Sequence, residues 1–424
     1  MHFKLLAQPA QGFSVGFPVV LAFLLVAFAG VLPAADVDCP GESINDYLAG
    51  LVKTGPNTVS ISGTCTESVN VDGFKDLTLN GPAVIQPVAG SYALRITGSE
   101  GVGINGLTFQ GPCTTSAQPT GLPLVSVSRS SNVRFGGCTI EKSAGTGLQV
   151  DDSLAVEVWP GAIQDNCGTG MAVNGASTAS VGFWGFGEWS DTYVQRNGAG
   201  LSIDRGAEVW VIHSATIQEN RGSGVSLSRD SHMVGCCTGP EYTGPKFLNN
   251  EGWGIAASTG SVVQLWGKNL IEGNRGGGVS FNASQGEMWG GTVIQDNGDP
   301  DDDIPNAGID VAMNSSATFD SIVVDNNDHG ISVYMNSSVG ICSPTISGNP
   351  RRGIEMSLSS TGHIWCPGTL TGNGGADVLC DTTSSLAGNK DAIIGKIKCP
   401  GYAEDPFTPR FLPPEEAGEV LVRG

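Results

Sequence analysis

The sequence predicts an all-β solenoid, a stack of coils built from short strands, because one asparagine recurs at a nearly constant interval and an apolar alternation follows it. Most intervals are 23 or 24 residues, and three longer ones of 29 to 31 residues leave room for insertions. A period in this range is typical of solenoid proteins. The recurring residues are Asn166, Asn197, Asn220, Asn250, Asn274, Asn297, Asn326, Asn349 and Asn373.

Two apolar residues, five and seven positions after the asparagine, give each coil the alternation of a β-strand. Met171 and Val173 follow Asn166 in this way, as Val279 and Phe281 follow Asn274. No stretch of helical periodicity long enough for a two-helix or leucine-rich repeat fits inside a coil, so these solenoid classes are excluded. The 62 glycines and the 15% of charged residues suit a turn-dense β protein. We expect about three short strands in each coil.

The turn at the asparagine has a physical explanation. Asparagine tolerates left-handed backbone geometry and bonds neighbouring peptide groups, and the glycines that follow supply positive φ without a Cβ clash. Asparagines stacked at one place in each coil can bond one another as a ladder. Over residues 55–395 this pattern resembles the right-handed parallel β-helix repeat proteins of the pectin-lyase-like superfamily. The resemblance implies a right-handed parallel β-helix of 23–24 residues per coil across residues 55–400, and it implies no particular activity because the ladder residues are structural.

Both ends of the stack need covers, since an open end exposes unpaired strand edges. Residues 36–54 form the expected N-terminal cap, in which a helix over Ser43 to Lys53 begins at Ser43 as its N-cap. Its apolar residues follow the spacing of an amphipathic helix laid over the first coil, namely Ile44, Tyr47, Leu48, Leu51 and Val52. Residues 401–424 are rich in proline and glutamate and are expected to form a flexible C-terminal tail.

Residues 1–35 read as a secretory signal peptide. An apolar run from Phe17 to Leu32 follows the positively charged Lys4, and Ala34 and Ala35 offer a small-residue cleavage site. The run is short for a membrane span. The alternative is an uncleaved N-terminal anchor, which would be the only membrane association. In either case the solenoid is expected to be secreted, periplasmic or on the cell surface.

Eleven cysteines support an oxidising compartment. Cys342 and Cys366 occupy neighbouring coils almost in register, at a separation that suits a disulfide. Nearer the two ends we expect three further pairs: Cys39 with Cys65, Cys113 with Cys138, and Cys380 with Cys399. Cys167, Cys236 and Cys237 remain, so at least one thiol is unpaired, and no C-x-x-C spacing indicates a metal site.

The net charge of −20 restricts the partner. A surface this acidic repels nucleic acid and anionic lipid and offers no basic groove for a polyphosphate. It also weighs against a polyuronate lyase, which needs cationic groups to neutralise the carboxylates of its substrate. The sequence contains neither the paired aspartates of polygalacturonase-like hydrolases nor the aspartate-rich signature of alginate epimerases.

Two insertions, around Trp184 to Thr192 and Cys236 to Lys246, project from the same turn two coils apart, with the coil of His213 between them. Flat aromatic faces beside carboxylates suit sugar rings and their hydroxyls. The predicted carbohydrate-binding residues are Trp184, Trp189, His213 and Tyr242. The candidate catalytic carboxylates, should the protein be an enzyme, are Glu188, Asp191 and Glu241. The alternative is that the aromatics only cover the solenoid, since Trp159, Trp266 and Trp365 share one position in their coils and form a stacked column.

The third insertion opens after Asn297 and is crowded with aspartates, and the next coil adds more at the same turn beside His329. Hard oxygen ligands at this density suit Ca²⁺, although an exposed acidic loop or an acid–base pair explains them as well. The spacing matches neither an EF-hand nor the nonapeptide calcium repeats. The candidate ligands are Asp299, Asp301, Asp302, Asp303, Asp325 and Asp328. We expect no other cofactor.

Two classes of function fit the sequence. The first is a secreted or cell-surface protein with a non-catalytic binding or structural role, most plausibly towards carbohydrate, and the lack of a catalytic signature favours it. The second is a polysaccharide-active enzyme, a glycoside hydrolase rather than a lyase, that uses carboxylates in the coil insertions. The fold alone does not distinguish these two classes, and the geometry of a site is needed to choose between them.

Overall fold

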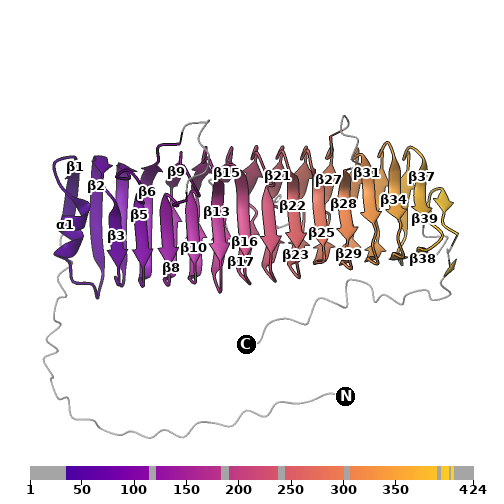
Figure 1. Ribbon diagram of the computed structural model, residues 1–424, viewed down its shortest axis with the longest axis horizontal. Helices are drawn as coiled ribbons and strands as arrows, with labels where there is room; N and C mark the ends of the chain where they lie inside the picture. The colour runs from indigo at the N-terminus through magenta and orange to yellow at the C-terminus, as the bar shows by residue number, and fades with distance from the viewer. Residues whose placement is uncertain are drawn as a thin grey trace, which may run out of the picture. The chain divides into compact units, whose positions relative to one another are not determined.

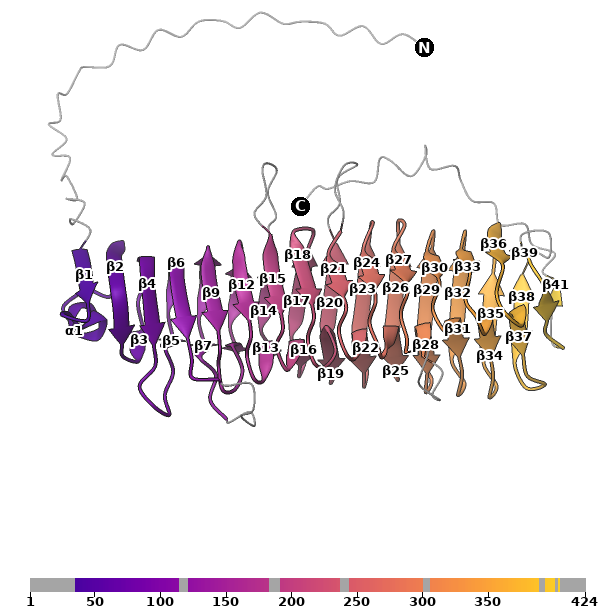
Figure 2. The ribbon, with the colours of Figure 1, turned by 90° about the horizontal axis from the view of Figure 1, so that it is seen from above.

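The computed structural model describes residues 35–113, 121–182, 191–236, 244–299, 306–388, 393–400 and 403–404. These residues form parallel strands that stack side by side along one axis (Figure 1). Each coil contributes one strand to a 14-stranded sheet, called sheet B, and one or two strands to a 27-stranded sheet, called sheet A. Where a coil contributes two strands to sheet A, we call them its first and second strands in chain order. Figure 2 shows three rows of strands along the stack: the second strands of sheet A, the first strands of sheet A and the strands of sheet B.

Sheet B comprises β3 (Val69–Asp72), β5 (Leu94–Thr97), β7 (Val125–Ser128), β10 (Leu148–Asp151), β13 (Thr169–Asn174), β16 (Ala199–Asp204), β19 (Val225–Ser228), β22 (Trp253–Ser258), β25 (Gly277–Asn282), β28 (Ala307–Ala312), β31 (His329–Val333), β34 (Arg352–Met356), β37 (Ala376–Cys380) and β40 (Ile397–Lys398). Neighbouring strands pair in parallel with matching register. Every coil therefore places equivalent residues at the strand spacing of about 4.8 Å.

Sheet A begins with the short β1 (Ala35–Cys39). Three long strands follow that each span a whole side of their coil: β2 (Asn57–Thr66), β4 (Leu77–Gln86) and β6 (Glu100–Gln110). Later coils divide this side into a first and a second strand. The first strands are β8 (Ser131–Gly136), β11 (Leu154–Val158), β14 (Thr178–Val181), β17 (Glu208–Ile212), β20 (His232–Cys236), β23 (Val262–Trp266), β26 (Gln285–Trp289), β29 (Ser316–Asp320), β32 (Ser338–Cys342), β35 (Thr361–Ile364) and β38 (Ser385–Gly388). The second strands are β9 (Cys138–Glu141), β12 (Gly161–Gln164), β15 (Thr192–Gln195), β18 (Ala215–Gln218), β21 (Lys246–Leu248), β24 (Leu270–Glu272), β27 (Val293–Gln295), β30 (Val323–Asp325), β33 (Thr345–Ser347), β36 (Gly368–Thr371) and β39 (Ile393–Ile394). The last strand, β41 (Ala403–Glu404), pairs with β38.

A short helix, α1 (Ile44–Ala49), lies at the N-terminal end of the stack (Figure 1). Ser43 is its N-cap and accepts a hydrogen bond from the Asp46 amide, while Ile44 and Leu48 are buried. The helix is shorter than the sequence indicates, and Val52 is exposed. The described part of the chain contains no helix with the length and hydrophobicity that a membrane span requires.

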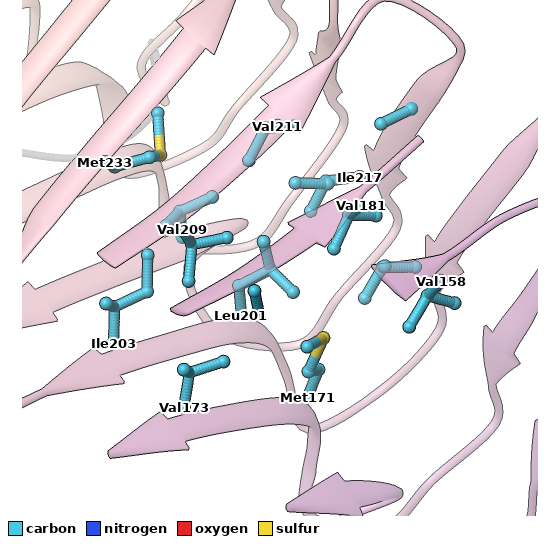
Figure 3. Packing of buried hydrophobic residues seen from close by; sticks show 14 of the residues in the cluster. Val158, Met171, Val173, Val181, Leu201, Ile203, Val209, Val211, Ile217 and Met233 are labelled. Carbon is cyan, nitrogen blue, oxygen red and sulfur yellow. The ribbon is translucent and has the colours of Figure 1, made fainter. Parts of the chain in front are cut away.

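The core runs unbroken through the stack, between sheet B and sheet A. In Figure 3, Met171 and Leu201 of sheet B point towards Val181, Val209 and Val211 of sheet A. All of these side chains are at most 1% exposed. Each fully buried aliphatic side chain of this size contributes roughly 1.5 to 3 kcal/mol of hydrophobic stabilisation.

Buried asparagine amides form the expected ladder along one corner. Each carboxamide oxygen accepts both the backbone N–H and the side-chain Nδ2 of the asparagine in the preceding coil, and each Nδ2 also donates to a backbone carbonyl. Asn220 Nδ2 donates to Asn250 Oδ1 at 2.9 Å, and Asn250 Nδ2 donates to Asn274 Oδ1 at 2.8 Å. The ladder ends at Asn373, which donates to Asp377 at 2.8 Å.

Two details of the predicted turn are wrong. The ladder passes through Asn327 and not Asn326: Asn297 donates to Asn327, which donates in turn to Asn349. The left-handed residue is the one that precedes each ladder asparagine, with φ of 55° at Asp165, 52° at Asn249 and 53° at Asn326. Asn326 therefore makes the turn and leaves the next residue to join the ladder.

One column of glycines after the ladder serves close packing rather than positive φ. One glycine of each coil lies against the ladder and against the equivalent glycine of the next coil. A Cβ on Gly224 would lie 2.7 Å from the Gly254 carbonyl oxygen and 2.8 Å from Asn250 Nδ2, so no larger residue fits there. The column comprises Gly147, Gly170, Gly200, Gly224, Gly254, Gly278, Gly308, Gly330 and Gly353.

A second, unpredicted ladder of serines lies at the turn between sheet B and the first strands of sheet A. The Ser130 amide donates to Ser153 Oγ and the Ser153 amide to Ser177 Oγ, each at 3.1 Å. Alanine replaces serine at position 207, and the pattern resumes towards the C-terminus, where the Ser284 amide donates to Ser315 Oγ. These hydroxyls satisfy backbone groups that burial at the turn would otherwise leave unpaired.

The structure contains the expected disulfides Cys39–Cys65, Cys342–Cys366 and Cys380–Cys399. The expected pair Cys113–Cys138 is wrong, because Cys113 pairs with Cys167. Both lie three residues beyond the ends of strands that occupy the same position in their coils, β6 and β12. Cys138 instead points into the core, where burial raises the pKa of its thiol to about 11. Cys236 is also disulfide-bonded.

Asn250→Ala should lower the thermal unfolding midpoint strongly, since it removes the buried oxygen that accepts both the Asn220 backbone N–H and the Asn220 Nδ2. The Asn220 backbone N–H then loses its partner, and Nδ2 keeps only its bond to the Val194 carbonyl oxygen. Each unsatisfied buried group costs about 1 to 3 kcal/mol, so we expect a loss of roughly 3 kcal/mol or more. Circular dichroism melting measures this change. Asn282→Ala, at an outward strand end, is the matched control and should melt within about 0.5 kcal/mol of the unsubstituted protein. Equal melting of both variants would contradict a stabilising role for the ladder.

Candidate functional site

Two insertions leave the stack at one corner, between the first and second strands of sheet A. The first runs between Gly182 and Asp191 and the second between Cys236 and Gly244, and the coil between them closes with the tight turn of His213. The strand register shows that the first insertion, His213 and the second insertion belong to three successive coils, because Val181 pairs with Val211 and Val211 pairs with Gly235. The predicted residues Trp184, Glu188, Trp189, Glu241 and Tyr242 lie outside the described residues.

Asp191 and His213 are the predicted site residues of this corner that the structure describes. The Asp191 carboxylate is exposed and accepts the Tyr193 hydroxyl at 2.9 Å, a bond that raises the pKa of Tyr193. His213 is partly buried at the turn. Its coil lies between the coils of the two insertions, as the sequence predicts.

Towards the C-terminus the same corner carries two exposed indole rings, Trp266 and Trp289. We call these rings, together with the partly buried Trp210 of β17, the tryptophan edge. Trp266 and Trp289 pair across adjacent coils and are 40% and 45% exposed. Trp210 meets Trp266 edge to face, with ring centroids 6.3 Å apart. The expectation that Trp266 serves packing alone is therefore incomplete. Trp365, at the equivalent position, instead packs against His363 and over Gly340.

Polar side chains form a row beside the tryptophan edge. His232 Nε2 lies 3.0 Å from Gln264 Oε1, and Gln264 Nε2 donates to Glu287 Oε2 at 2.9 Å. The Trp210 indole N–H donates to Glu208 at 2.7 Å. Fixed amide and carboxylate groups next to flat rings can bind the hydroxyls of a sugar whose ring stacks on the indoles.

The aspartates at the third insertion form what we call the acidic edge, namely Asp299, Asp301, Asp302, Asp303, Asp325 and Asp328. Two of its described members form ion pairs with arginine. Asp299 lies 2.5 Å from Arg275, and Asp328 lies 2.9 Å from Arg351. Asp325 is placed differently, at the end of β30, where it accepts the Ser347 hydroxyl at 3.0 Å. Asp301, Asp302 and Asp303 lie outside the described residues.

Pairing with arginine leaves Asp299 and Asp328 poorly suited as Ca²⁺ ligands, since a cation would have to displace the guanidinium groups. Among the described residues, three potential ligand atoms come together at Cys39, Cys65 and Glu67, where both thiols are in a disulfide. Calcium binding at the acidic edge stays a prediction.

The outer face of sheet B carries a shallow depression of about 290 Å³. Its lining residues are uncharged, and half of them are serines: Ser202, Ser226, Leu227, Ser228, Trp253, Ala256, Ala257, Ser258, Ser280 and Asn282. A larger depression of about 670 Å³ lies near Gln86 and Leu122, but its described lining residues carry no titratable side chain and so support no acid–base or metal chemistry.

Next to the sheet B depression lies a group of titratable side chains that the sequence analysis missed. Asp310 pairs in register with Ser280 of the depression and with Ser332 of the next coil. The Tyr334 hydroxyl donates to Asp310 at 3.0 Å. Burial raises the pKa of Asp310 to about 6, and burial together with this carboxylate raises the pKa of Tyr334 to about 12.

Glu355 lies one coil beyond Ser332, with which it pairs in register, and therefore two coils beyond Asp310. Its carboxylate lies 3.1 Å from His329 Nδ1. The hydrogen bond from His329, followed by the charges of Arg352 and Arg351, lowers the pKa of Glu355. The sequence contains a signal for this group. Once coils are aligned on the ladder, Asp310 and Glu355 fall in an outward column that holds Ser202, Ser226, Ala256 and Ser280 in earlier coils.

A family model described as a right handed beta helix region matches residues 232–390. The fold of the described chain is a right-handed parallel β-helix. The right-handed parallel β-helix that the sequence predicts is confirmed, and the matched segment includes Trp266, Asp310 and Glu355.

Solved structures of low identity resemble this β-helix protein. A double mutant of the periplasmic alginate epimerase AlgG is 13% identical, with 85% of this chain and 84% of that chain covered and a TM-score of 0.41. The Dettilon tailspike protein is 12% identical, with 79% and 60% covered and a TM-score of 0.38. The DFA-IIIase from Arthrobacter chlorophenolicus A6 without its lid is 13% identical, with 91% and 98% covered and a TM-score of 0.34. Similarities of this size carry no functional argument, and no curated protein matches the sequence.

Asp310→Asn should stabilise the β-helix at neutral pH. The pKa of Asp310 is raised in the folded state from 3.8 to about 6, so the unfolded chain ionises first and stability falls as pH rises from about 4 to 6. The amide removes this loss, and a shift of about two pKa units predicts a gain of about 1 to 3 kcal/mol above pH 6. Thermal unfolding at pH 4 and pH 7.5 should show the gain only at pH 7.5.

Asp72→Asn is the control for this effect, because Asp72 lies in an outward column of sheet B and is exposed beside Lys53. We expect this variant to have the same thermal unfolding midpoint as the unsubstituted protein at both pH values. A gain for Asp310→Asn that is equal at pH 4 and pH 7.5 would contradict a raised pKa for Asp310.

Proposed function

We propose that the protein is a secreted or cell-surface carbohydrate-binding protein whose glycan ligand lies along the tryptophan edge. The observation that carries this proposal is the exposure of two indole rings, Trp266 and Trp289, in register on adjacent coils. Large exposed apolar surfaces on a soluble protein mark sites of interaction. The fixed row of Gln264 and Glu287 beside the rings supplies partners for sugar hydroxyls.

The charge of the edge favours a neutral glycan. Glu208 and Glu287 lie beside the rings, and Asp320 pairs in register with Trp289. Anionic uronates would meet these carboxylates and a net charge of −20, whereas hydroxyl groups can donate to them. A neutral, extended polysaccharide running parallel to the stack would place successive sugar rings over successive coils.

An extracytosolic location is part of this proposal. The four disulfides between described cysteines support it, because such bonds persist in oxidising compartments. The predicted signal peptide, residues 1–35, agrees with them.

Replacement of both exposed rings, Trp266→Ala with Trp289→Ala, should weaken glycan binding by at least about tenfold, since about 1.4 kcal/mol of lost stacking corresponds to that factor. A glycan array of neutral and acidic polysaccharides identifies the ligand, and isothermal titration calorimetry measures its affinity. Leu154→Ala removes an exposed apolar side chain elsewhere on sheet A and should leave affinity unchanged. Undiminished binding by the double variant, or selective binding of acidic polymers, would overturn the proposal.

A further inference from the structure

The outer face of sheet B combines a hydroxylated floor with a pair of carboxyl groups in opposite environments. The depression around Trp253 and Ser280 borders the strand that carries Asp310, since Ser280 and Asp310 are register partners. This face is separate from the tryptophan edge, which lies on the corner of sheet A. It holds the titratable side chains that the carbohydrate-binding proposal leaves unused.

Asp310 has the properties of a proton donor. Burial favours its protonated form, with a pKa of about 6, and its Oδ2 accepts the Tyr334 hydroxyl at 3.0 Å. The pKa of Tyr334, about 12, keeps the proton on the phenol and fixes this bond. The other carboxyl oxygen can then carry the acidic proton towards a bound ligand.

Glu355 has the properties of a proton acceptor. The His329 imidazole holds it at 3.1 Å, and together with Arg352 and Arg351 keeps the pKa of Glu355 below its ordinary value. The His329 side chain is only 9% exposed. Its Nε2 has no hydrogen-bond partner among the described residues, which leaves a buried polar atom within this group of side chains.

The register of Asp310 and Glu355 is compatible with one kind of hydrolysis. Ser332 lies between them in register, so their backbone positions are two coils, or about 10 Å, apart. Inverting glycosidases hold their acid and base about 6.5 to 9.5 Å apart to admit a water molecule, whereas retaining enzymes need about 5 to 5.5 Å. Carboxyl groups whose environments move their pKa values in opposite directions are the mark of an acid and base pair.

We propose that Asp310 and Glu355 are the general acid and the general base of a site on sheet B that hydrolyses glycosidic bonds in neutral glycans. The neutral substrate class rests on the proposed function and on the uncharged lining of the depression. Glu355 takes a proton from water as the water oxygen bonds to the anomeric carbon, and the bond to the leaving oxygen breaks as Asp310 protonates that oxygen. Proton exchange with solvent then restores both groups, and the product has inverted configuration.

The test uses the full mature chain and a panel of neutral polysaccharides that includes any glycan bound at the tryptophan edge. New reducing ends should appear, and Asp310→Asn and Glu355→Gln should each lower their rate by at least about 100-fold. Asp72→Asn is the matched control on the same face and should keep full activity. Proton NMR of fresh product should show the inverted anomer.

The pH profile separates a catalytic role from a structural one. Activity should fall as pH rises through about 6, when Asp310 loses its proton, and should fall at low pH, when Glu355 gains one. The hydrogen bond from Tyr334 favours ionised Asp310, so Tyr334→Phe should move the alkaline limb to higher pH. Tyr334 is the titratable side chain bonded to Asp310, and His329, Arg351 and Arg352 are those that act on Glu355.

The outcomes for the two sites are distinguishable. Binding at the tryptophan edge without new reducing ends from any polysaccharide would overturn hydrolysis alone. Hydrolysis that survives in Asp310→Asn or Glu355→Gln would overturn the assignment of these residues. The double variant Trp266→Ala with Trp289→Ala should still hydrolyse short oligosaccharides. If no polysaccharide of the panel is bound and none releases new reducing ends, both proposals are overturned.

Discussion

Parallel pairing of equivalent strands is the constraint on which the rest of this molecule depends. Because each coil sits about 4.8 Å above the last, a residue at a given position meets its own equivalents on both sides. A buried polar group is then tolerated only if it can bond a copy of itself. Asparagine meets this demand with one donor and one acceptor group on the same amide, and the glycine column gives that amide the space it needs.

This constraint explains how far the fold could be predicted. The interval between asparagines and the inward alternation identify the coil, its strands and its insertions without structural information. The choice between Asn326 and Asn327 could not be made this way, because the residues are adjacent and chemically identical. Backbone geometry decides it, since the residue with positive φ must precede the ladder and Asn326 takes that conformation. The same limit applies to Cys113, whose partner depends on which side chains point out of the core.

The sites were harder to predict than the fold. Insertions between strands are visible in the sequence, and they located the corner at which His213 and the tryptophan edge lie. Trp266 shares its coil position with Trp159 and Trp365, and the sequence therefore indicated a packing role. Its exposure depends on which neighbouring side chains cover the ring, and this is known only from the structure. Asp310 and Glu355 were missed for another reason. Their coil positions are readable in the sequence, but the burial and hydrogen bonds that separate their pKa values exist only in three dimensions.

Outward columns are free to carry function because the ladders and the core already specify the stack. Small residues such as Ser226 and Ala256 occupy the Asp310 column in earlier coils, so two carboxyl groups there disturb no inward contact. Carboxyl groups on adjacent coils would repel each other at about 5 Å, and the intervening Ser332 doubles that distance. The residual cost of burying Asp310 is then met by protonation, which is the state that an acid catalyst needs. The repeat thus places one carboxyl group in its acid form and the other in its base form, with a serine hydroxyl between them.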